Sequence, residues 1–380
     1  MSIAFKTTPR RILVRGVNWL GDAVMTTPAL MRLREKFPDA HIALLTPEKL
    51  RDLWPGHSAV NETILFAPHE NVFVVGKKLR AGKFDLALVL PNSPRSAIET
   101  RLAGIPHRIG CARPWRNFFL TQTVAPRPDA VPQCRMRKRP VSEIKRLVAA
   151  DVNRRTIHEN RAFTSAASDA HQIHEYLHLV AALGANPEPI APQLFVTPEE
   201  VAAAKKKFRL EKIAGPIFGL NPGAEYGPAK RWPVERFIAA AREIQSRTNS
   251  TWLVFGGQAD AAVARRIESA IPSPPSAIWN LAGKTSLREL MALLKLCRVL
   301  LTNDSGPMHV AAALGTPVVV PFGSTSPELT GPGLPGDPRH RLLKSDAPCS
   351  PCFLRECPID FRCMNGITVE SVVEAVLSVG

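Results

Sequence analysis

The sequence predicts an α/β protein with two domains, each built around a parallel β-sheet. Its 380 residues exceed the size at which one hydrophobic core usually keeps growing, and 45% of them are hydrophobic, which is enough for two cores. Short apolar runs alternate with amphipathic stretches in both halves of the chain, as is typical of βαβ units. Four prolines at 185–200 separate the halves and predict an interdomain linker, because proline cannot continue a helix.

In the first half, apolar runs that are expected to form strands alternate with stretches of helical periodicity. Strands are predicted at 11–15, 41–46, 62–67 and 84–91, and helices at 21–37, 47–54, 93–104 and 169–184. The alternation restarts after the linker. Its strands are predicted at 217–223, 251–257 and 298–304, and its helices at 232–245, 260–270, 286–296 and 306–315. We therefore expect domains at 1–187 and 188–365, followed by a last helix at 366–380.

Residues 134–161 depart from this alternation. They hold nine Lys or Arg against three Asp or Glu, without strong periodicity. The segment is expected to be an excursion of the first domain that is not part of its core. A solvated surface loop and a docking surface for an anionic acceptor or membrane are equally compatible with this composition.

The formal charge of +16 indicates an acidic partner, such as a nucleic acid, an anionic membrane or a phosphorylated substrate. Aromatic residues make up 6% of the chain and no nucleic-acid-binding motif is present, so nucleic acid is disfavoured. The N-terminus lacks the features of a secretory signal, and no run of about 18 apolar residues occurs. We therefore expect a cytoplasmic protein.

Asp22 lies in the loop NWLGDAVMTTPAL, directly after the first predicted strand. Gly16 and Gly21 have the spacing of a phosphate-binding loop, but Asp22 and Ala23 stand where Lys and Ser or Thr would follow. A carboxylate at the head of a helix would repel a phosphate, so this loop is not expected to bind a nucleotide. Asp22 suits a general base, and a helix N-cap is its alternative role. No GxGxxG fingerprint occurs, which argues against a dinucleotide-dependent oxidoreductase.

Lys230 ends a post-strand loop of the second half, GLNPGAEYGPAKRWP at 219–233. Glycine permits the backbone to approach a ligand closely, and a cation held by a rigid turn can neutralise a phosphate. A solvated surface lysine is the alternative for Lys230 taken alone. The loop repeats the topology of the Asp22 loop, which favours the functional interpretation.

A second candidate phosphate loop is TNDSGPMH at 302–309, between a predicted strand and an apolar helix. The backbone N–H groups of Ser305, Gly306 and Met308 would point at an anion, and the helix dipole favours a diphosphate. His309 could donate to the same oxygens. A plain helix cap and an interior histidine are the alternatives.

These loops resemble those of the bacterial heptosyltransferases of glycosyltransferase family nine. The resemblance runs in order along nearly the whole chain, in NWLGDAVMTTPAL, LPNSPRSA, AGIPHRIG, PGAEYGPAKRWP, LAGKTSL and NDSGPMHVAAALGTP. It implies a GT-B fold, with two Rossmann-like domains facing across a cleft and a C-terminal helix that packs back on the first domain. It also implies a metal-independent, inverting transfer of heptose from ADP-L-glycero-β-D-manno-heptose to the first heptose of the lipopolysaccharide inner core.

The resemblance also implies roles for individual residues. Asp22 matches the general base and Lys230 the cation that stabilises the departing ADP, while Asp304 matches the residue that contacts the donor sugar. The remaining donor-binding positions are Ser305, Gly306, His309, Gln258, Leu281, Gly283, Thr285 and Glu225. The acceptor-binding positions are Asn18, Asn92, Ser93 and Arg95. Arg95 could pair with an anionic group of the core oligosaccharide, and an exposed arginine without that role is equally compatible.

Four cysteines near the C-terminus have the spacing of a compact metal site. Cys349, Cys352, Cys357 and Cys363 are separated by two, four and five residues. A structural zinc and reduced thiols are both expected alternatives, with an iron–sulfur cluster and a disulfide behind them. Such a closed site would hold the tail in place and would not catalyse.

Two competing functions remain open from the sequence. A different nucleotide sugar or core acceptor would leave the loop motifs unchanged, because they report on the diphosphate more than on the sugar. A protein that binds anionic polymers would use the +16 charge and should show a steep salt dependence. For the heptosyltransferase that the resemblance implies, the partners are ADP-heptose and the lipopolysaccharide inner core, Kdo-lipid A with one heptose. Such an enzyme would lie peripherally on the cytoplasmic face of the inner membrane.

Overall fold

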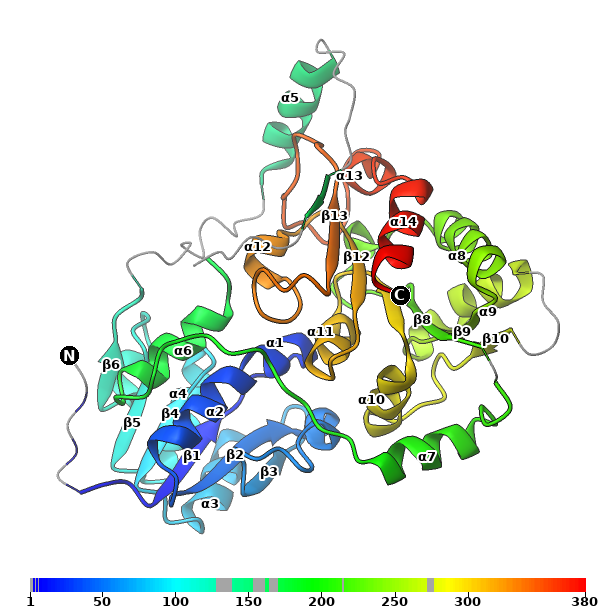
Figure 1. Ribbon diagram of the computed structural model, residues 1–380. Coiled ribbons are helices and arrows are strands. Elements are labelled where there is room, and N and C mark those ends of the chain that lie inside the picture. Colours follow the sequence, from blue (N-terminus) through cyan, green and yellow to red (C-terminus); the bar gives the residue numbers. More distant parts are fainter. Residues whose placement is uncertain are drawn as a thin grey trace. The chain divides into compact units, whose positions relative to one another are not determined.

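The computed structural model of the chain describes residues 3, 5, 7–127, 139–152, 161–163, 170–213, 215–271 and 277–380 (Figure 1). The chain forms two compact units, the first made of residues 1–130 and 172–195 and the second of 131–171 and 196–380. Both are α/β units around a largely parallel sheet, which confirms the predicted fold class. The chain passes for the last time from the first unit to the second between Phe195 and Val196, inside the proline-rich segment.

The first unit contains a six-stranded sheet in the order β3-β2-β1-β4-β5-β6, and its paired strands are parallel. Strand residues such as Ile12, Leu13 and Val14 are fully buried, as expected where helices cover both faces. The strands are β1 (Arg11–Arg15), β2 (His41–Pro47), β3 (Glu62–Phe66), β4 (Leu86–Val89), β5 (His107–Cys111) and β6 (Gln122–Val124).

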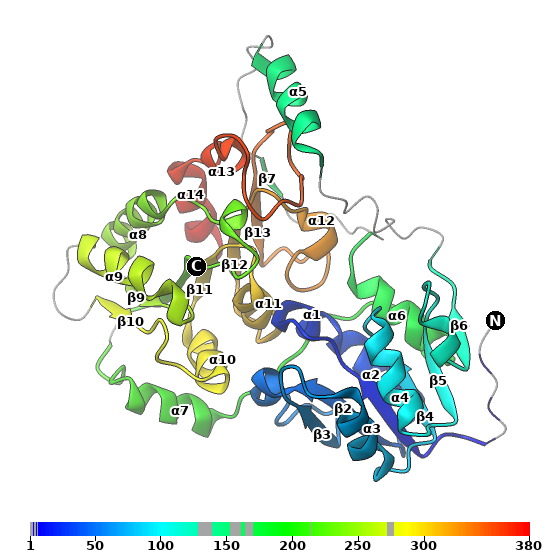
Figure 2. The same cartoon turned by 180° about the vertical axis from the view of Figure 1, so that it is seen from behind.

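Helices cover both faces of this sheet. In Figures 1 and 2, α2 packs with α6, and α3 packs with α4 on the opposite face. The helices are α1 (Leu20–Met25), α2 (Thr27–Lys36), α3 (Val72–Arg80), α4 (Pro94–Leu102) and α6 (Ile173–Ala181), with 3-10 turns η1 (Glu48–Leu53) and η2 (Asn117–Phe119).

The helix expected at 21–37 is divided into α1 and α2. Pro28 has no N–H to donate to the Val24 carbonyl, and the Thr27 hydroxyl donates to that carbonyl instead at 2.8 Å. The neighbouring Thr26 hydroxyl donates to Ala23 O at 2.7 Å. The expected helix at 47–54 is likewise a 3-10 turn, η1.

The second unit contains a seven-stranded sheet in the order β10-β9-β8-β11-β12-β13-β7, in which only the edge strand β7 is paired antiparallel. Its central strands are flanked by a large core that includes Phe218, Trp252 and Val299. The strands are β7 (Arg161–Phe163), β8 (Ile217–Asn221), β9 (Thr251–Val254), β10 (Ile278–Asn280), β11 (Val299–Thr302), β12 (Val318–Phe322) and β13 (Arg341–Lys344).

Helices of the second unit follow its strands in the predicted order. Helices α8, α9 and α14 pack in one group and α10 with α11 in another (Figure 2). The helices are α5 (Val141–Val152), α7 (Pro198–Lys207), α8 (Val234–Thr248), α9 (Ala261–Ala270), α10 (Leu287–Leu296), α11 (Gly306–Ala313), α12 (Pro327–Thr330), α13 (Arg362–Asn365) and α14 (Val369–Val379), with turns η3 (Pro228–Lys230) and η4 (Gln258–Asp260).

Two segments belong to the second unit against expectation. Helix α14 was expected to return to the first domain, whereas its buried valines, including Val372 and Val376, pack with α8 and strands β11–β13. Residues 134–161 were expected to be an excursion of the first domain. Of their described part, α5 belongs to the second unit and buries Ile144 in its core, and β7 extends its sheet.

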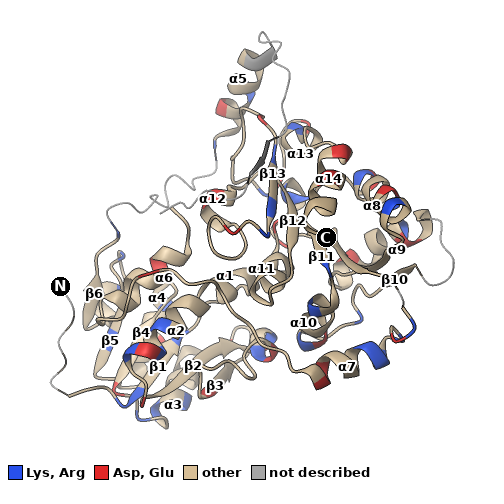
Figure 3. Cartoon of the chain, viewed as in Figure 1, with Lys and Arg blue, Asp and Glu red and all other residues tan. Residues whose placement is uncertain are grey.

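Charged side chains are mixed in sign on the helices. Helices α2, α7 and α8 each carry acidic and basic residues (Figure 3). Within the part of the chain that the structure describes, no helix is both long enough and apolar enough to span a membrane.

Candidate active site

Asp22 lies in the first turn of α1, whose N-cap is Trp19, so Asp22 is not the helix cap that its sequence position suggested as the alternative. Its Oδ1 accepts a hydrogen bond from Gln172 Nε2 at 3.5 Å, and the same nitrogen donates to the Tyr176 hydroxyl at 2.9 Å. Burial, together with the charge of Asp22, raises the pKa of Tyr176 well above its usual value. The carboxylate is therefore supported by an amide and lies near a neutral phenol.

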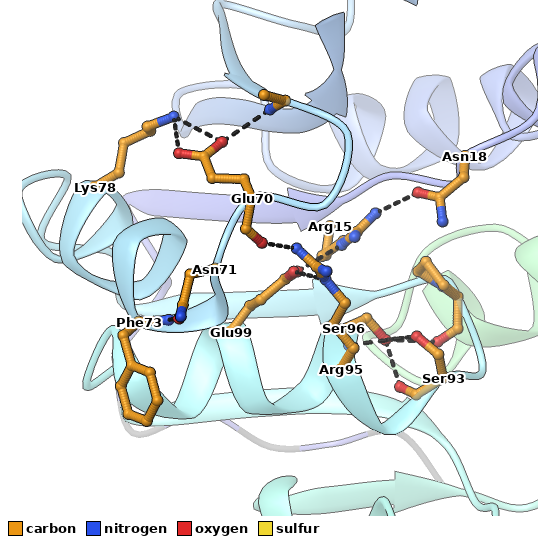
Figure 4. Close-up of polar contacts among 12 residues, drawn as sticks. Arg15, Asn18, Glu70, Asn71, Phe73, Lys78, Ser93, Arg95, Ser96 and Glu99 are labelled. Carbon is orange, nitrogen blue, oxygen red and sulfur yellow. Dashed lines mark hydrogen bonds and ion pairs between the residues drawn. The ribbon is translucent and has the colours of Figure 1, made fainter.

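Asn18, a predicted acceptor-binding residue, is held by a buried arginine. Arg15 Nη1 donates to Asn18 Oδ1 at 3.0 Å, and Arg15 Nε pairs with Glu99 at 3.0 Å (Figure 4). The Arg15 guanidinium also lies 4.5 Å from the centroid of the Phe66 ring. Burial lowers the pKa of Arg15, against the opposing charge of Glu99. The Asn18 amide nitrogen carries two N–H donors that this contact does not use.

Arg95 is held in the same network, and its role in acceptor binding stays a prediction. Its Nε pairs with Glu99 Oε1 at 2.9 Å, and its Nη2 donates to the Glu70 carbonyl (Figure 4). The side chain is 39% exposed. Ser93 is the N-cap of α4 and accepts from Ser96 N at 3.4 Å, which is a structural role at the same loop.

Asn92 is held in a similar way by Arg116, which is fully buried although arginine is seldom so. Arg116 Nη1 donates to Asn92 Oδ1 at 3.1 Å. Its Nε and Nη2 have no hydrogen-bond partner among the described residues, and burial lowers its pKa. A Cβ on Gly110 would lie 2.7 Å from Nη2, so Gly110 leaves the room that this guanidinium occupies.

In the second unit, Lys230 and Asp304 form an ion pair of 2.6 Å in which both side chains are largely buried. Asp304 Oδ2 also accepts from the Thr325 hydroxyl at 2.5 Å. Both contacts use Oδ2, and Oδ1 takes part in neither. An ammonium has three donors, so Lys230 can hold Asp304 and still donate to a phosphate oxygen. The structure thus brings together the two residues that the sequence placed in separate loops.

His309 lies one turn into α11 and is buried. Burial lowers its pKa to about 4, against the opposing charge of Asp304 and with the help of His171 and Lys230. At neutral pH it is therefore a neutral imidazole, which can donate from one ring nitrogen only.

The start of α11 offers fewer N–H groups than predicted. Met308 N donates to Ser305 O at 3.1 Å, and Pro307 has none, so the expectation for Met308 is wrong. The Ser305 hydroxyl interacts with Asn221 Nδ2 at 3.0 Å. The backbone N–H groups of Ser305 and Gly306 remain the candidates for a bound anion.

Of the remaining predicted donor-binding residues, Gln258 follows β9, and Leu281, Gly283 and Thr285 follow β10. Gly283 has a φ of +73°, and a Cβ there would lie 2.3 Å from Gln258 Oε1, so the two residues are in direct contact. Leu281 N donates to Val254 O at 2.9 Å and Leu281 is buried. Thr285 is partly exposed and Glu225 is exposed. The roles of these residues stay predictions.

Sequence reasoning missed several residues that position these groups. Thr325 follows β12, so the rule that ligands lie at the carboxyl ends of parallel strands could have found it. Tyr226 stands inside a recognised motif, and its ring lies 5.0 Å from Lys230 Nζ and 5.2 Å from Arg355 Cζ. Arg15 and Arg116 carry no sequence signal, because nothing marks an arginine as buried.

The four C-terminal cysteines are free thiols. Burial raises the pKa of Cys349, Cys352 and Cys363, the last to about 12, and each is raised further by neighbouring cysteines. In the described residues, no group of three or more His, Cys, Asp or Glu is arranged to hold a metal ion. The expected structural zinc site is therefore not supported, and the alternative of reduced thiols agrees with the structure.

Comparison with known proteins gives consistent matches along the chain. The sequence pattern of glycosyltransferase family 9 (heptosyltransferase) matches residues 72–136 and 143–361. Lipopolysaccharide heptosyltransferase 2 of Salmonella typhimurium is 32% identical over 331 residues, which is 85% of each chain. The protein of the same name from Escherichia coli K12 is 31% identical over 331 residues, again 85% of each chain.

Solved structures agree with the sequence matches. The structure of E. coli ADP-heptose LPS heptosyltransferase II has a TM-score of 0.75 and 27% identity, covering 97% of this chain and 98% of that one. A family 9 glycosyltransferase from Veillonella parvula also has a TM-score of 0.75, with 20% identity over 100% of this chain and 99% of that one, and supports the fold alone. The chain therefore belongs to glycosyltransferase family 9, the heptosyltransferases, and is a glycosyltransferase of the GT-B fold.

Proposed function

We propose that this enzyme transfers heptose from ADP-L-glycero-β-D-manno-heptose to the first heptose of the lipopolysaccharide inner core, with inversion and without a catalytic metal ion. The observation that carries the proposal is the Lys230–Asp304–Thr325 cluster at the start of α11, in a chain of this family. The relatives named as heptosyltransferase 2 support the choice of donor and acceptor.

The acceptor half of the reaction is assigned to the first unit. The acceptor hydroxyl oxygen attacks the anomeric carbon of the heptose, and its proton passes to the Asp22 carboxylate as the new bond forms. Gln172 donates to this carboxylate at Oδ1. Asn18 and Asn92, each held by a buried arginine, are assigned to acceptor sugar oxygens.

The donor half is assigned to the second unit. The bond between the anomeric carbon and the diphosphate oxygen breaks, and ADP leaves with the electron pair. Lys230 and the N–H groups of Ser305 and Gly306 stabilise the negative charge that develops on this oxygen. Asp304 Oδ1 accepts from a heptose hydroxyl, while neutral His309 donates to the diphosphate. These groups supply the charge stabilisation that a metal ion gives in other enzymes.

The acceptor sugar belongs to a lipid-anchored molecule, so we further propose that the enzyme acts peripherally at the inner membrane. No membrane-spanning helix is found in the described residues, and a peripheral contact would not need one.

The test is a transfer assay with purified enzyme, ADP-heptose and a lipid-free inner-core oligosaccharide that carries one heptose. We expect ADP release, one added heptose per acceptor and the opposite anomeric configuration by NMR, unchanged by a chelator. The same assay with an acceptor without heptose should give little product.

A thermal-shift panel separates the alternatives within the family. ADP-heptose should raise the melting temperature more than other ADP-sugars or GDP-sugars. Transfer to the acceptor without heptose, or a larger shift with another nucleotide sugar, would assign a different step of core synthesis.

A further inference from the structure

The first unit exposes its large hydrophobic side chains at one edge of its sheet. In the described part of this unit they are Trp19 (50% exposed), Phe73 (67%), Val74 (51%), Trp115 (88%), Phe118 (82%) and Phe195 (37%). Phe195 packs its ring against His57. Trp19, Phe73 and Val74 follow the carboxyl ends of β1 and β3, and Trp115 and Phe118 lie in the connection from the carboxyl end of β5 to the start of β6. Because these strands belong to one parallel sheet, their carboxyl ends lie along the same edge. We call Trp19, Phe73, Val74, Trp115 and Phe118 the aromatic edge.

Trp115 and Phe118, the most exposed members, lie in a loop whose shape is fixed. Arg113 N donates to Asn117 Oδ1 at 2.8 Å, and Phe119 N donates to Arg116 O at 2.9 Å. Trp115 has a φ of +66°, a conformation that is unfavourable for a bulky residue. The loop thus keeps an aromatic side chain in water at a cost in backbone energy, as is common at functional sites.

The loop is connected to the proposed acceptor site. Arg116 lies between Trp115 and Asn117 in sequence, is fully buried, and donates to Asn92 Oδ1 at 3.1 Å. Asn18 follows β1 at the same edge, directly before Trp19. Phe73, in the first turn of α3, points away from the Arg95–Glu99 network in Figure 4. The aromatic edge therefore adjoins the residues assigned to the acceptor.

The charge around this loop selects an anionic partner. Residues 101–127 hold five arginines and no Asp or Glu, and of these arginines Arg116 is buried. Lys49 Nζ lies 4.9 Å from the Trp19 ring. Exposed Trp and Phe beside basic side chains are typical of surfaces that bind the headgroup region of an anionic bilayer.

We propose that the aromatic edge docks on an anionic lipid surface, with Trp115 and Phe118 entering the headgroup region and the nearby arginines facing lipid phosphates. The proposal rests on the proposed function in one respect: a lipid-anchored acceptor explains why docking and acceptor residues share an edge. Docking would bring the carboxyl ends of β1 and β4 to the membrane face that carries the acceptor.

The test compares variants in sedimentation with vesicles of phosphatidylethanolamine and phosphatidylglycerol. Trp115→Ser with Phe118→Ser should lower the vesicle partition coefficient by about tenfold or more, because it removes the two aromatic side chains that would enter the headgroup region. Exchanging the two, Trp115→Phe with Phe118→Trp, should preserve binding. Val141→Ala removes an exposed apolar side chain from α5, in the basic region of the other unit, and should have no effect.

Several results would overturn the proposal. These are no binding of the wild-type protein to anionic vesicles, undiminished binding by the Ser double variant, or a loss of binding in Val141→Ala. Equal binding to neutral phosphatidylcholine vesicles would also contradict the role of charge. If the Ser variant binds vesicles normally but loses a protein partner, the edge is a protein-docking surface instead.

Activity measured with two acceptors separates this proposal from the proposed function. The Ser double variant should transfer to a lipid-free acceptor at the wild-type rate and lose rate only on an acceptor embedded in vesicles. If the wild type binds vesicles but transfers no heptose, the proposed function is contradicted and the docking surface is not. Normal transfer to both acceptors by the Ser double variant would contradict the docking surface and leave the proposed function intact.

Discussion

Glu99 is fully buried and pairs with two arginines, Arg15 at 3.0 Å and Arg95 at 2.9 Å. Arg15 is also buried, so this pair carries two charges that have left water. Desolvation makes such a pair costly to break, even where forming it contributes little net stability. The ion pair also fixes the position of Asn18, because Arg15 donates a hydrogen bond to the Asn18 side chain. Single buried charges thus connect the core of the first unit to the candidate acceptor site.

Glu99→Ala should destabilise the first unit by about 3–5 kcal/mol, because it leaves Arg15 buried without a counter-charge. Arg15→Met with Glu99→Met should cost less than Glu99→Ala alone, since no buried charge remains. Urea unfolding at neutral pH measures both. A loss below about 1 kcal/mol in Glu99→Ala would show that water reaches Arg15 and that the pair is effectively exposed.

Buried histidines predict how stability depends on pH. Burial lowers the pKa of His57, His309 and His340 to about 4 in each case. Unfolded histidines bind a proton near pH 6.5, so between 6.5 and 4 the unfolded chain holds more protons than the folded one. Their contribution is complete above that window and is lost as the pH falls through it.

His57→Gln should therefore reduce the slope of unfolding free energy against pH in this window, by up to about 1.4 kcal/mol per pH unit. Urea unfolding between pH 6.5 and 4 measures the slope. An unchanged slope would mean that His57 is protonated in the folded protein.

At the scale of elements, the C-terminal cysteine segment supports the loop that carries Lys230. Tyr226 OH donates to Phe353 O at 2.7 Å, and Ala229 N donates to Arg355 O at 3.0 Å. A Cβ on Gly227 would lie 2.5 Å from Arg355 O, so the two segments touch through backbone. The role that sequence reasoning gave to a metal, holding the tail in place, is carried in part by these hydrogen bonds.

Two substitutions of Tyr226 should have different effects on ADP binding. Tyr226→Phe removes one hydrogen bond, at a cost of about 1 kcal/mol of stability, and keeps the ring between Lys230 and Arg355. Tyr226→Ala removes the ring and should raise the Kd of ADP roughly tenfold, because Lys230 loses its support. Calorimetry measures both. If both variants lose the same affinity for ADP, the hydroxyl of Tyr226 and not its ring supports ADP binding.

For the whole molecule, the βαβ alternation was sufficient to predict two parallel sheets and seven of their strands, β1–β4, β8, β9 and β11. The other strands, β5, β6, β7, β10, β12 and β13, were not predicted. Parallel strands buried on both faces leave a strong apolar pattern, and the residues that follow them were recognisable as candidate site loops. The alternation did not predict which distant segments of the chain contact each other. The membership of α5 and α14 in the second unit depends on packing partners that the local pattern does not encode.

The same limit applied to the site. Asp304 and Lys230 were singled out from separate motifs, whereas their ion pair needed the fold. Helix α1 ends because Pro28 has no N–H to donate and the Thr26 and Thr27 hydroxyls donate to carbonyls of α1, which the helical periodicity of 21–37 did not indicate. Buried Arg116 looked like any other basic residue in an arginine-rich stretch. Motifs predicted the candidate loops, and packing determined which side chains contact their residues.

In the proposed function Asp22 acts as the base and Lys230 contacts the donor diphosphate. Donor affinity and transfer rate should be measured together for Asp22→Asn and Lys230→Ala, with ADP-heptose and a lipid-free monoheptosylated acceptor. We predict that Asp22→Asn binds donor as the wild type does while kcat falls at least about a hundredfold, and that Lys230→Ala loses donor affinity as well as rate. An Asp22→Asn enzyme that keeps most of its rate, or that loses donor binding along with it, would contradict this account.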